Sequence, residues 1–358
     1  MCSQTYSWHE YISHSSSEGV SGGGPYRALS IKEYFEKQSG KIHSERGMPN
    51  VMNIESLRRT FSEDALWPQS LEWGQHDYTL QGAQRAQTFN DLVQDGFGQP
   101  QNAEEFSRWA QLINYNGYRG MFEATSKSRA GLLLWMSHPC WPSMVWQTYD
   151  YYFEPTAAYF GAKKACEPLH IQYNAMTDSI EIVNHSAGSQ IALTAMATVY
   201  DLNGKRIYQQ KTRIDSEEDS TFSWTTLAKL MPSAPSDVYF VSLRIMDKKS
   251  TLSENLYIMG RTTNNYKASL SIPDTEIEQR VMQIGPSQME LKLRNKGKYP
   301  APFLRLNLKC KDGEQILPVI YSDNYITLMP GESKTILIRW NREDARGQQP
   351  HIEITGLK

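Results

Sequence analysis

The sequence predicts a multidomain protein of the α/β plus all-β class, and three observations support that prediction. The chain has 358 residues, which is enough for two or three domains of ordinary size. Up to residue 167 it combines helical periodicity with short apolar runs, whereas alternation of apolar and polar residues takes over after Pro168. We therefore expect helices around a few strands in the first part and β-sandwiches in the rest.

The first part predicts helices packed around two strands. Residues 1–40 are rich in Ser and Gly and are expected to be mostly loop, with one periodic segment in SIKEYFEKQ. Strands are expected at 41–45 and 131–137, and the continuous apolar run GLLLWMSH of the second is typical of a strand buried on both faces. The spacing of apolar residues predicts helices at 54–62, 80–95, 103–126 and 157–167.

Glu45 is the carboxylate that this arrangement singles out. It ends the first predicted strand, and Gly47 and Pro49 then break regular structure before Asn53, which could cap the next helix. In a parallel α/β architecture, catalytic side chains usually project from the carboxyl ends of the strands. The alternative from spacing alone is a solvated glutamate in a surface turn.

The second part predicts two β-sandwiches in tandem, over 168–266 and 267–358. Short alternating runs separated by turns such as DLNGK are typical of such strands. The runs are LHIQYN, SIEIVNH, ALTAMATVYD, VYFVSLRIMD and LSENLYIMG in the first sandwich, and MELKLRNKG, FLRLNLKCKDG, ILPVIYSD and KTILIRWN in the second. The two sets share no identity at a fixed period, so a solenoid is excluded.

Composition excludes several classes of partner. With 21% charged residues and a formal net charge of -2, the chain has no electrostatic footprint for nucleic acid or an anionic membrane. No window reaches the ~18 apolar residues of a membrane span. Polar sequence follows Cys2, so no signal peptide or lipid anchor is expected at this end. The cysteines have no paired spacing, so we expect no metal site, disulfide framework or cofactor; they are Cys2, Cys140, Cys166 and Cys310.

Aromatic residues are frequent in the first part. The chain has 9 Trp and 20 Tyr, and the segments DALWPQSLEWGQHDY and LLLWMSHPCWPSMVWQTYDYYF are dense in both. Flat apolar faces beside polar groups suit sugar rings. Packing in the core or between domains is the alternative for most of these side chains.

Three segments resemble glycoside hydrolase family 2, in its branch of exo-β-D-glucosaminidases and β-mannosidases. HSERGMPNVMNIESLRR resembles the segment that ends the seventh barrel strand and supplies the catalytic nucleophile. The stretch from LLLWMSHPCWPS to ACEPLHI resembles the eighth strand, its WPS loop and the helix that leads into the next domain. SDNYITLMPGES resembles a hairpin of the last immunoglobulin-like sandwich. The resemblance runs in the right order from Gly24 onward.

The resemblance implies the carboxyl-terminal portion of a (β/α)8 (TIM) catalytic barrel over 1–167, followed by two immunoglobulin-like β-sandwiches. Two strands cannot close a barrel. The family's acid/base glutamate follows an Asn well upstream of the nucleophile, and residues 1–40 hold no such pair; Glu10 and Glu18 lie in polar loop sequence. We therefore expect the isolated chain to be inactive, with the missing amino-terminal part as a partner. The complete enzyme is expected to be periplasmic or extracellular, and the oligomeric state stays open.

By the same resemblance, Glu45 is the nucleophile of a retaining glycosidase acting on terminal β-linked hexosamine or mannose. Such an enzyme needs a second carboxylate roughly 5 Å away as acid/base. Trp135, at the end of the eighth strand, is expected to form the floor on which a sugar stacks, with a cap on the core as the alternative. Trp67, His76 and Trp141 are weaker candidates for the pocket rim, and each has a structural alternative.

Two further points concern the neighbourhood of Glu45. Its carboxylate must stay ionised, so hydrogen-bond donors are expected around it, and Tyr26 and His43 are near in sequence. His138 stands where family members commonly have Asn, so a polar contact there is expected to differ. The alternative function is a non-catalytic carbohydrate-binding or interaction module derived from such an enzyme.

Overall fold

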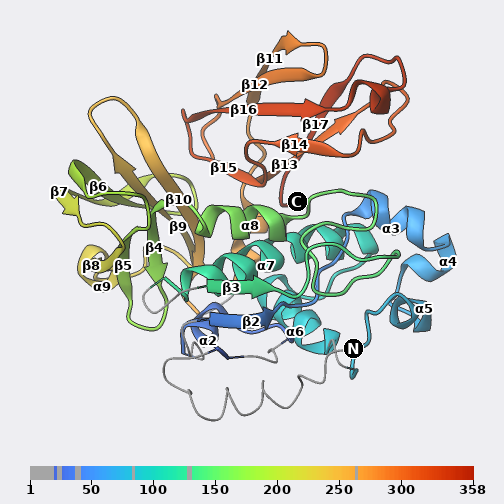
Figure 1. The fold of residues 1–358 in the computed structure, drawn as a ribbon, viewed down its shortest axis with the longest axis horizontal. Coiled ribbons are helices and arrows are strands. Elements are labelled where there is room, and N and C mark those ends of the chain that lie inside the picture. Colours follow the sequence, from blue (N-terminus) through green and yellow to red (C-terminus); the bar gives the residue numbers. More distant parts are fainter. Residues whose placement is uncertain (1–19, 22–25, 37–41, 83–84, 127–130, 263–264) are drawn as a thin grey trace.

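The computed structural model describes residues 20–21, 26–36, 42–82, 85–126, 131–262 and 265–358 (Figure 1). These residues form a helical part around a small parallel sheet, followed by a first and a last β-sandwich. In Figure 1 the first sandwich lies to the left of the helices and the last one lies above them. Most of the segment 1–40, which was expected to be loop, lies outside the described residues.

The parallel sheet has three strands in the order β1-β2-β3, namely Val20–Ser21, Ile42–Arg46 and Gly131–Leu134. β2 is the strand predicted at 41–45, whereas β1 is too short to leave a pattern in the sequence. Val20 pairs with Ile42, and Ile42 pairs with Gly131 on its other side, both in parallel. Helices supply the crossover connections that parallel neighbours require. The interpretation of this sheet as part of a barrel stays a proposal, because three parallel strands leave two open edges.

β3 differs from the strand predicted at 131–137. It ends at Leu134, and the Leu133 side chain is 60% exposed, so the strand is not buried on both faces. The reason is its position at an edge of the sheet, where it pairs only with β2 among the described residues. The chain leaves the sheet after the Trp135 amide donates to the Arg46 carbonyl, with N···O 3.0 Å.

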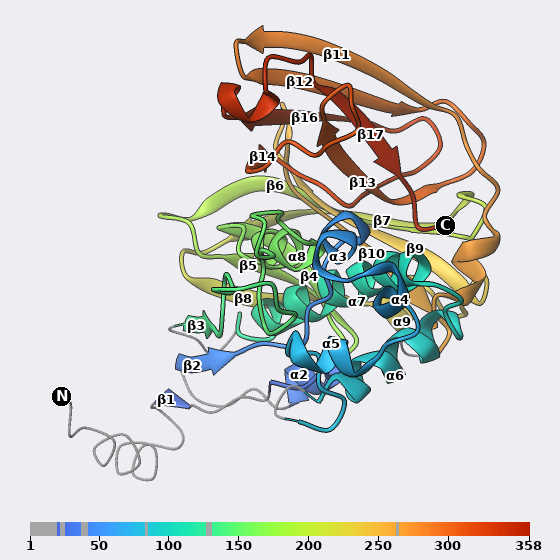
Figure 2. The same cartoon turned by 90° about the vertical axis from the view of Figure 1, so that its right-hand side faces the viewer.

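The helical part is built around one long helix. The helices are α2 Ile31–Glu36, α3 Ile54–Thr60, α4 Glu63–Leu66, α5 Leu71–Gln75, α6 Ala86–Phe97, α7 Ala103–Glu123 and α8 Ala157–Ala165. In Figures 1 and 2, α7 lies between the parallel sheet and α8. The Asn102 side chain caps α7 by accepting from the Glu105 amide at 2.9 Å. α6 begins six residues after the predicted residue 80, because Arg85 takes a left-handed conformation (φ 48°) just before Ala86.

The first sandwich packs a three-stranded sheet, β4-β5-β8, on a four-stranded sheet, β10-β9-β6-β7. Its elements are β4 Leu169–Asn174, β5 Ser179–Asn184, β6 Gln190–Tyr200, β7 Arg206–Ser216, β8 Ser220–Thr226, α9 Leu227–Leu230, β9 Val238–Met246 and β10 Thr251–Gly260. Apolar side chains from both sheets, such as Ile182 and Val241, form a core of their own between them. A short 3-10 helix, η1 Lys267–Ser271, leads to the last sandwich.

The last sandwich also has a four-stranded sheet, β11-β12-β16-β14, and a three-stranded one, β15-β13-β17. Its elements are β11 Ile277–Gly285, β12 Gln288–Asn295, β13 Ala301–Lys309, β14 Val319–Tyr321, β15 Ile326–Leu328, β16 Ser333–Trp340, η2 Arg342–Ala345 and β17 His351–Thr355. The segment 322–333 is not a hairpin as its resemblance implied. β15 pairs with β13, whereas β16 pairs with β12 and β14, so this segment crosses from one sheet to the other.

The three parts share contacts. Arg119 of α7 donates to Asn255 of β10 at 2.8 Å, and Arg305 of β13 donates to Glu55 of α3 at 2.9 Å. Buried apolar residues of the helical part and of the last sandwich form one continuous core. The division of the chain at 167/168 and 266/267 stays a prediction. Among the described helices, none combines the length and apolar character needed to cross a membrane.

Candidate active site

Glu45 lies at the carboxyl end of β2 and is partly buried. The Tyr26 phenol donates a short hydrogen bond to its Oε2 atom. Burial raises the pKa of Tyr26 to about 12, and the hydrogen bond and the negative charge of Glu45 act in the same direction. Tyr26 therefore keeps its proton at neutral pH and remains a donor to the carboxylate.

The backbone after Glu45 is held between β3 and the loop that follows it. A Cβ atom on Gly47 would overlap the Trp135 carbonyl oxygen and the Trp146 Cβ, so only glycine fits at this position. Trp146 also positions Tyr26: its indole nitrogen donates to the Tyr26 carbonyl at 2.8 Å, and the two ring centroids lie 4.8 Å apart. The break in regular structure that the sequence placed at Gly47 is thus a packing requirement of the site.

Trp135 follows the last residue of β3, so it occupies the carboxyl end of the strand next to Glu45. Its side chain is 43% exposed, although it is a large aromatic. A half-exposed indole is an available stacking surface for a sugar ring. Its role as the floor of a sugar site stays a prediction.

The proposed rim residues fall into two groups. His76 and Trp141 stack on each other with ring centroids 5.4 Å apart, and Trp141 is 40% exposed. Trp67 instead packs against Phe106 and Trp73, with centroids 5.6 Å and 6.4 Å away, inside an aromatic cluster of the helical part. This placement favours the structural alternative for Trp67 and leaves His76 and Trp141 as rim candidates.

The two histidines near the site have different surroundings. His43 is buried on β2. His138 stacks on Phe153 with ring centroids 4.6 Å apart, and the expected difference in its polar contact stays a prediction. Trp146, which contacts both Gly47 and Tyr26, is the residue that the sequence reasoning missed. The only signal for it was the density of aromatics in the segment that follows β3.

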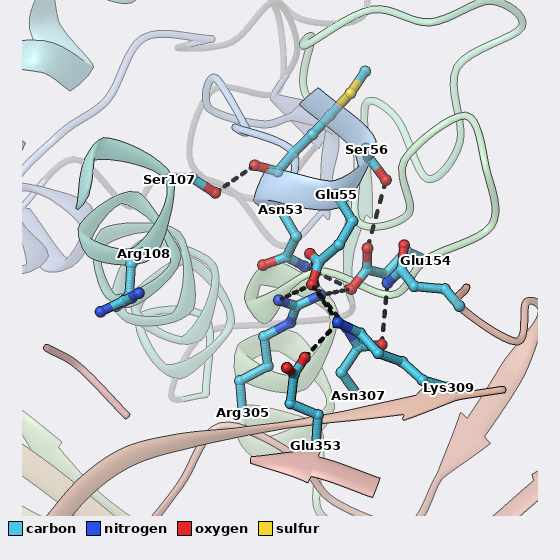
Figure 3. Close-up of polar contacts among 12 residues, drawn as sticks. Asn53, Glu55, Ser56, Ser107, Arg108, Glu154, Arg305, Asn307, Lys309 and Glu353 are labelled. Carbon is cyan, nitrogen blue, oxygen red and sulfur yellow. Dashed lines mark hydrogen bonds and ion pairs between the residues drawn. The ribbon is translucent and has the colours of Figure 1, made fainter. Parts of the chain in front are cut away.

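A buried charged cluster joins the loop after Glu45 to the last sandwich (Figure 3). Arg305 of β13 donates to Glu55 at 2.9 Å and to Glu154 at 2.5 Å. Burial alone would raise the pKa of Glu55, but the Arg305 guanidinium and its hydrogen bonds bring that pKa below its usual range. Asn53 directly precedes α3, but its side chain does not cap the helix, because its Oδ1 accepts from the Tyr325 hydroxyl at 3.2 Å. Its amide nitrogen donates to Glu154 and to the Tyr325 hydroxyl, both at 2.9 Å.

The described residues contain no group of three His, Cys, Asp or Glu side chains that could hold a metal ion. At Glu45 the structure shows a carboxylate with a phenol donor, and the half-exposed Trp135 directly follows the neighbouring strand β3.

Comparison with known proteins finds relatives among the glycoside hydrolases. Residues 255–358 match the family model of the exo-β-D-glucosaminidase Ig-fold domain. The chain is 27% identical to an exo-β-D-glucosaminidase of Streptomyces avermitilis, over 96% of this chain and 42% of that protein. It is similar to the carboxyl-terminal part of a family 2 glycoside hydrolase. A mannosylglycoprotein endo-β-mannosidase of Lilium longiflorum is 25% identical, over 97% of this chain and 45% of that protein.

A solved structure shows the same fold. The exo-chitosanase of Amycolatopsis orientalis superposes with a TM-score of 0.81 at 23% identity, over 93% of this chain and 44% of that chain. A variant of that exo-chitosanase has been solved in complex with PNP-β-D-glucosamine. The chain thus spans less than half the length of the glycoside hydrolases that it resembles, and its own activity is a matter for proposal.

Proposed function

We propose that this chain supplies the nucleophile, Glu45, of a retaining β-glycosidase that removes terminal β-linked hexosamine or mannose. The observation that carries the proposal is the position of Glu45. It lies at the carboxyl end of a parallel strand and accepts from the Tyr26 phenol, and the exposed Trp135 directly follows the neighbouring strand. The similarity to exo-β-D-glucosaminidases supports an amino sugar as the first substrate to test.

In this mechanism the Glu45 carboxylate attacks the anomeric carbon and forms a glycosyl-enzyme, while the leaving oxygen takes a proton from a second carboxylate. Tyr26 holds the carboxylate oxygen in place and donates to its charged form. Trp135 stacks on the sugar and excludes water from one face. Water then attacks the glycosyl-enzyme, and the second carboxylate takes its proton.

We further propose that the second carboxylate lies in a preceding part of the catalytic domain and that the isolated chain is inactive on ordinary substrates. Within the part of the chain that the structure describes, β3 has no partner on its outer side, and Leu133 on that strand is 60% exposed. An open, apolar strand edge favours pairing with further strands. Loss of the acid/base costs about 10²- to 10⁴-fold in rate.

The test uses substrates that differ in their need for an acid. The chain is assayed with nitrophenyl β-glucosaminide and β-mannoside, and with the dinitrophenyl glycosides, whose leaving groups need no proton. Azide is added to replace the base in the second step. We expect no turnover of the first set and slow, azide-dependent release from the second, with a glycosyl azide that retains the β configuration.

Two variants make the result specific. Glu45→Gln should abolish the azide-dependent release, whereas Glu343→Gln, at an exposed position on η2 far along the chain, should leave it unchanged. A 2-deoxy-2-fluoroglycosyl fluoride should add one sugar mass to the peptide that carries Glu45. Release that survives Glu45→Gln, or an adduct on another peptide, would refute Glu45 as nucleophile. Turnover of ordinary nitrophenyl glycosides that depends on Glu45 would instead place the acid/base within this chain.

A further inference from the structure

A cavity of about 320 Å³ lies where the first sandwich meets the helical part. It opens between α2 and α7 on one side and β4, α9, β9 and β10 on the other. Four tyrosines contribute to its walls: Tyr173, Tyr239, Tyr257 and Tyr266. The cavity shares no lining residue with the surroundings of Glu45 described above. Junctions between domains are frequent positions for small-molecule sites, and this volume is at the lower end of their usual range of about 300–1,000 Å³.

The aromatic walls are held in place by buried contacts. The Tyr257 hydroxyl donates to Glu123 at 2.8 Å, and the Arg119 guanidinium carbon lies 3.9 Å from the centre of the Tyr257 ring. Tyr173 meets Tyr257 edge to face, with centroids 6.0 Å apart and an angle of 72° between the rings. These rings therefore form a preformed surface rather than a set of mobile side chains.

Polar groups line the same cavity. The Tyr173 hydroxyl donates to Asp178 at 3.0 Å, and the other carboxylate oxygen of Asp178 accepts from the Ala228 amide at 2.8 Å. Each carboxylate oxygen can accept a further hydrogen bond, so Asp178 has capacity left for a ligand donor. Lys32 and Arg261 stand among the lining residues as well.

Tyr239 supplies a further polar group to the cavity. Its side chain is only 5% exposed, and its hydroxyl makes no hydrogen bond to any residue that the structure describes. Burial raises the pKa of Tyr239, and the charge of the nearby Asp178 adds to the effect, so the hydroxyl keeps its proton. This hydroxyl borders the cavity, so it is available to donate to or accept from a ligand there.

We propose that this cavity binds a pyranose unit of a carbohydrate, as a second sugar site separate from Glu45. A pyranose has apolar C–H faces that suit the tyrosine rings and a rim of hydroxyls that suit Asp178 and the Tyr239 hydroxyl. A purely apolar ligand would cover these polar groups without pairing them, which is unfavourable. The inference does not rest on the catalytic proposal for Glu45.

The test is methionine methyl NMR on the whole chain, because Met231 and Met259 line the cavity. Glucosamine, its β-1,4-linked disaccharide and mannose are titrated separately, with p-cresol as an apolar aromatic competitor. We expect at least one sugar to shift the Met231 and Met259 methyl signals in a saturable way. The same shifts should persist in Glu45→Gln, which separates this site from the proposed catalytic one.

Tyr239→Phe removes one hydroxyl that has no partner among the described residues, so it should leave folding intact. We expect it to weaken sugar binding roughly three- to tenfold, the loss of one hydrogen bond. Tyr208→Phe, on β7 and outside the cavity, is the matched control and should leave the affinity unchanged. The proposal is overturned if no sugar shifts these methyl signals, if only p-cresol does, or if Tyr239→Phe binds sugar as the parent does.

Discussion

The Arg305→Met substitution tests whether the last sandwich is fixed to the helical part by buried charge. Arg305 is 9% exposed and forms three hydrogen bonds across this boundary, two to Glu55 and one to Glu154 (Figure 3). Methionine keeps the length and apolar stem of the arginine but removes the charge. The substitution therefore leaves two largely buried carboxylates without their main cation.

The expected loss can be worked from the remaining contacts. Breaking a buried pair by removing one partner costs about 3–5 kcal/mol. Glu55 keeps the Asn307 amide at 2.9 Å and the Lys309 ammonium at 3.7 Å, and Glu154 keeps the Asn53 amide at 2.9 Å. Because these donors remain, we expect the lower end, a loss of about 3 kcal/mol in the free energy of unfolding.

The assay is urea unfolding at neutral pH followed by tryptophan fluorescence, with Arg58→Met as the control. Arg58 pairs with Glu104 at 3.4 Å, and both side chains are about half exposed, so its removal should cost less than about 1 kcal/mol. Adding Glu154→Gln to Arg305→Met should recover part of the loss, since one orphaned charge is then gone. Equal stability of the Arg305 and Arg58 variants would refute the reasoning.

Three further predictions concern stability. Burial lowers the pKa of His170, but Glu123 and Glu167 raise it above its usual value. The stabilising contribution of protonated His170 is therefore full below about pH 6.5 and is lost as the pH rises through the folded-state pKa. His170→Gln should flatten the dependence of the urea midpoint on rising pH, whereas exposed His351→Gln should not. Burial and the charge of Glu154 raise the pKa of Asp150 to about 7. The folded state therefore keeps a proton that the unfolded state has lost, and stability falls as the pH rises from about 4 to about 7. Asp150→Asn should remove that fall. A Cβ at Gly161 would overlap the Tyr115 carbonyl of α7, so Gly161→Ala should lower stability by about 1–3 kcal/mol in thermal unfolding. Gly131→Ala is the control, because a Cβ at Gly131 meets nothing within 4 Å.

Periodic patterns predicted the regular elements well where the element was long and bordered by clear signals. The helix expected at 103–126 is α7, Ala103–Glu123, and the strand expected at 41–45 is β2. Patterns failed where tertiary position decides the outcome. β3 reads as a strand buried on both faces, but at an edge of the sheet Leu133 is exposed. Nothing local in 322–333 shows that its two strands join different sheets.

The candidate site was only partly predictable for the same reason. The motif around Glu45 identified the carboxylate, and Tyr26, its hydrogen-bond donor, was named as a candidate because it is near in sequence. Trp146 could not be found, because its role depends on the close approach of three chain segments at Gly47. Asn53 has the sequence position of a helix cap, yet its amide serves a contact with a residue 272 positions away in the chain. Sequence spacing can identify the positions of candidate residues, whereas their hydrogen-bond and packing partners become visible only in the folded structure.

The Asn53 amide also ties the loop that follows Glu45 to a tyrosine of the last sandwich, through its 2.9 Å contact with Tyr325. The same loop contacts the helical part through Asn50, whose amide donates to Thr156 at 2.8 Å. The last sandwich therefore helps to fix the position of the loop that follows Glu45. Exchanging it for the sandwich of a distant relative would remove the contacts that hold the loop after Glu45. A working chimaera would therefore also need residues at positions 53, 55 and 154 that match the new sandwich, in place of Asn53, Glu55 and Glu154.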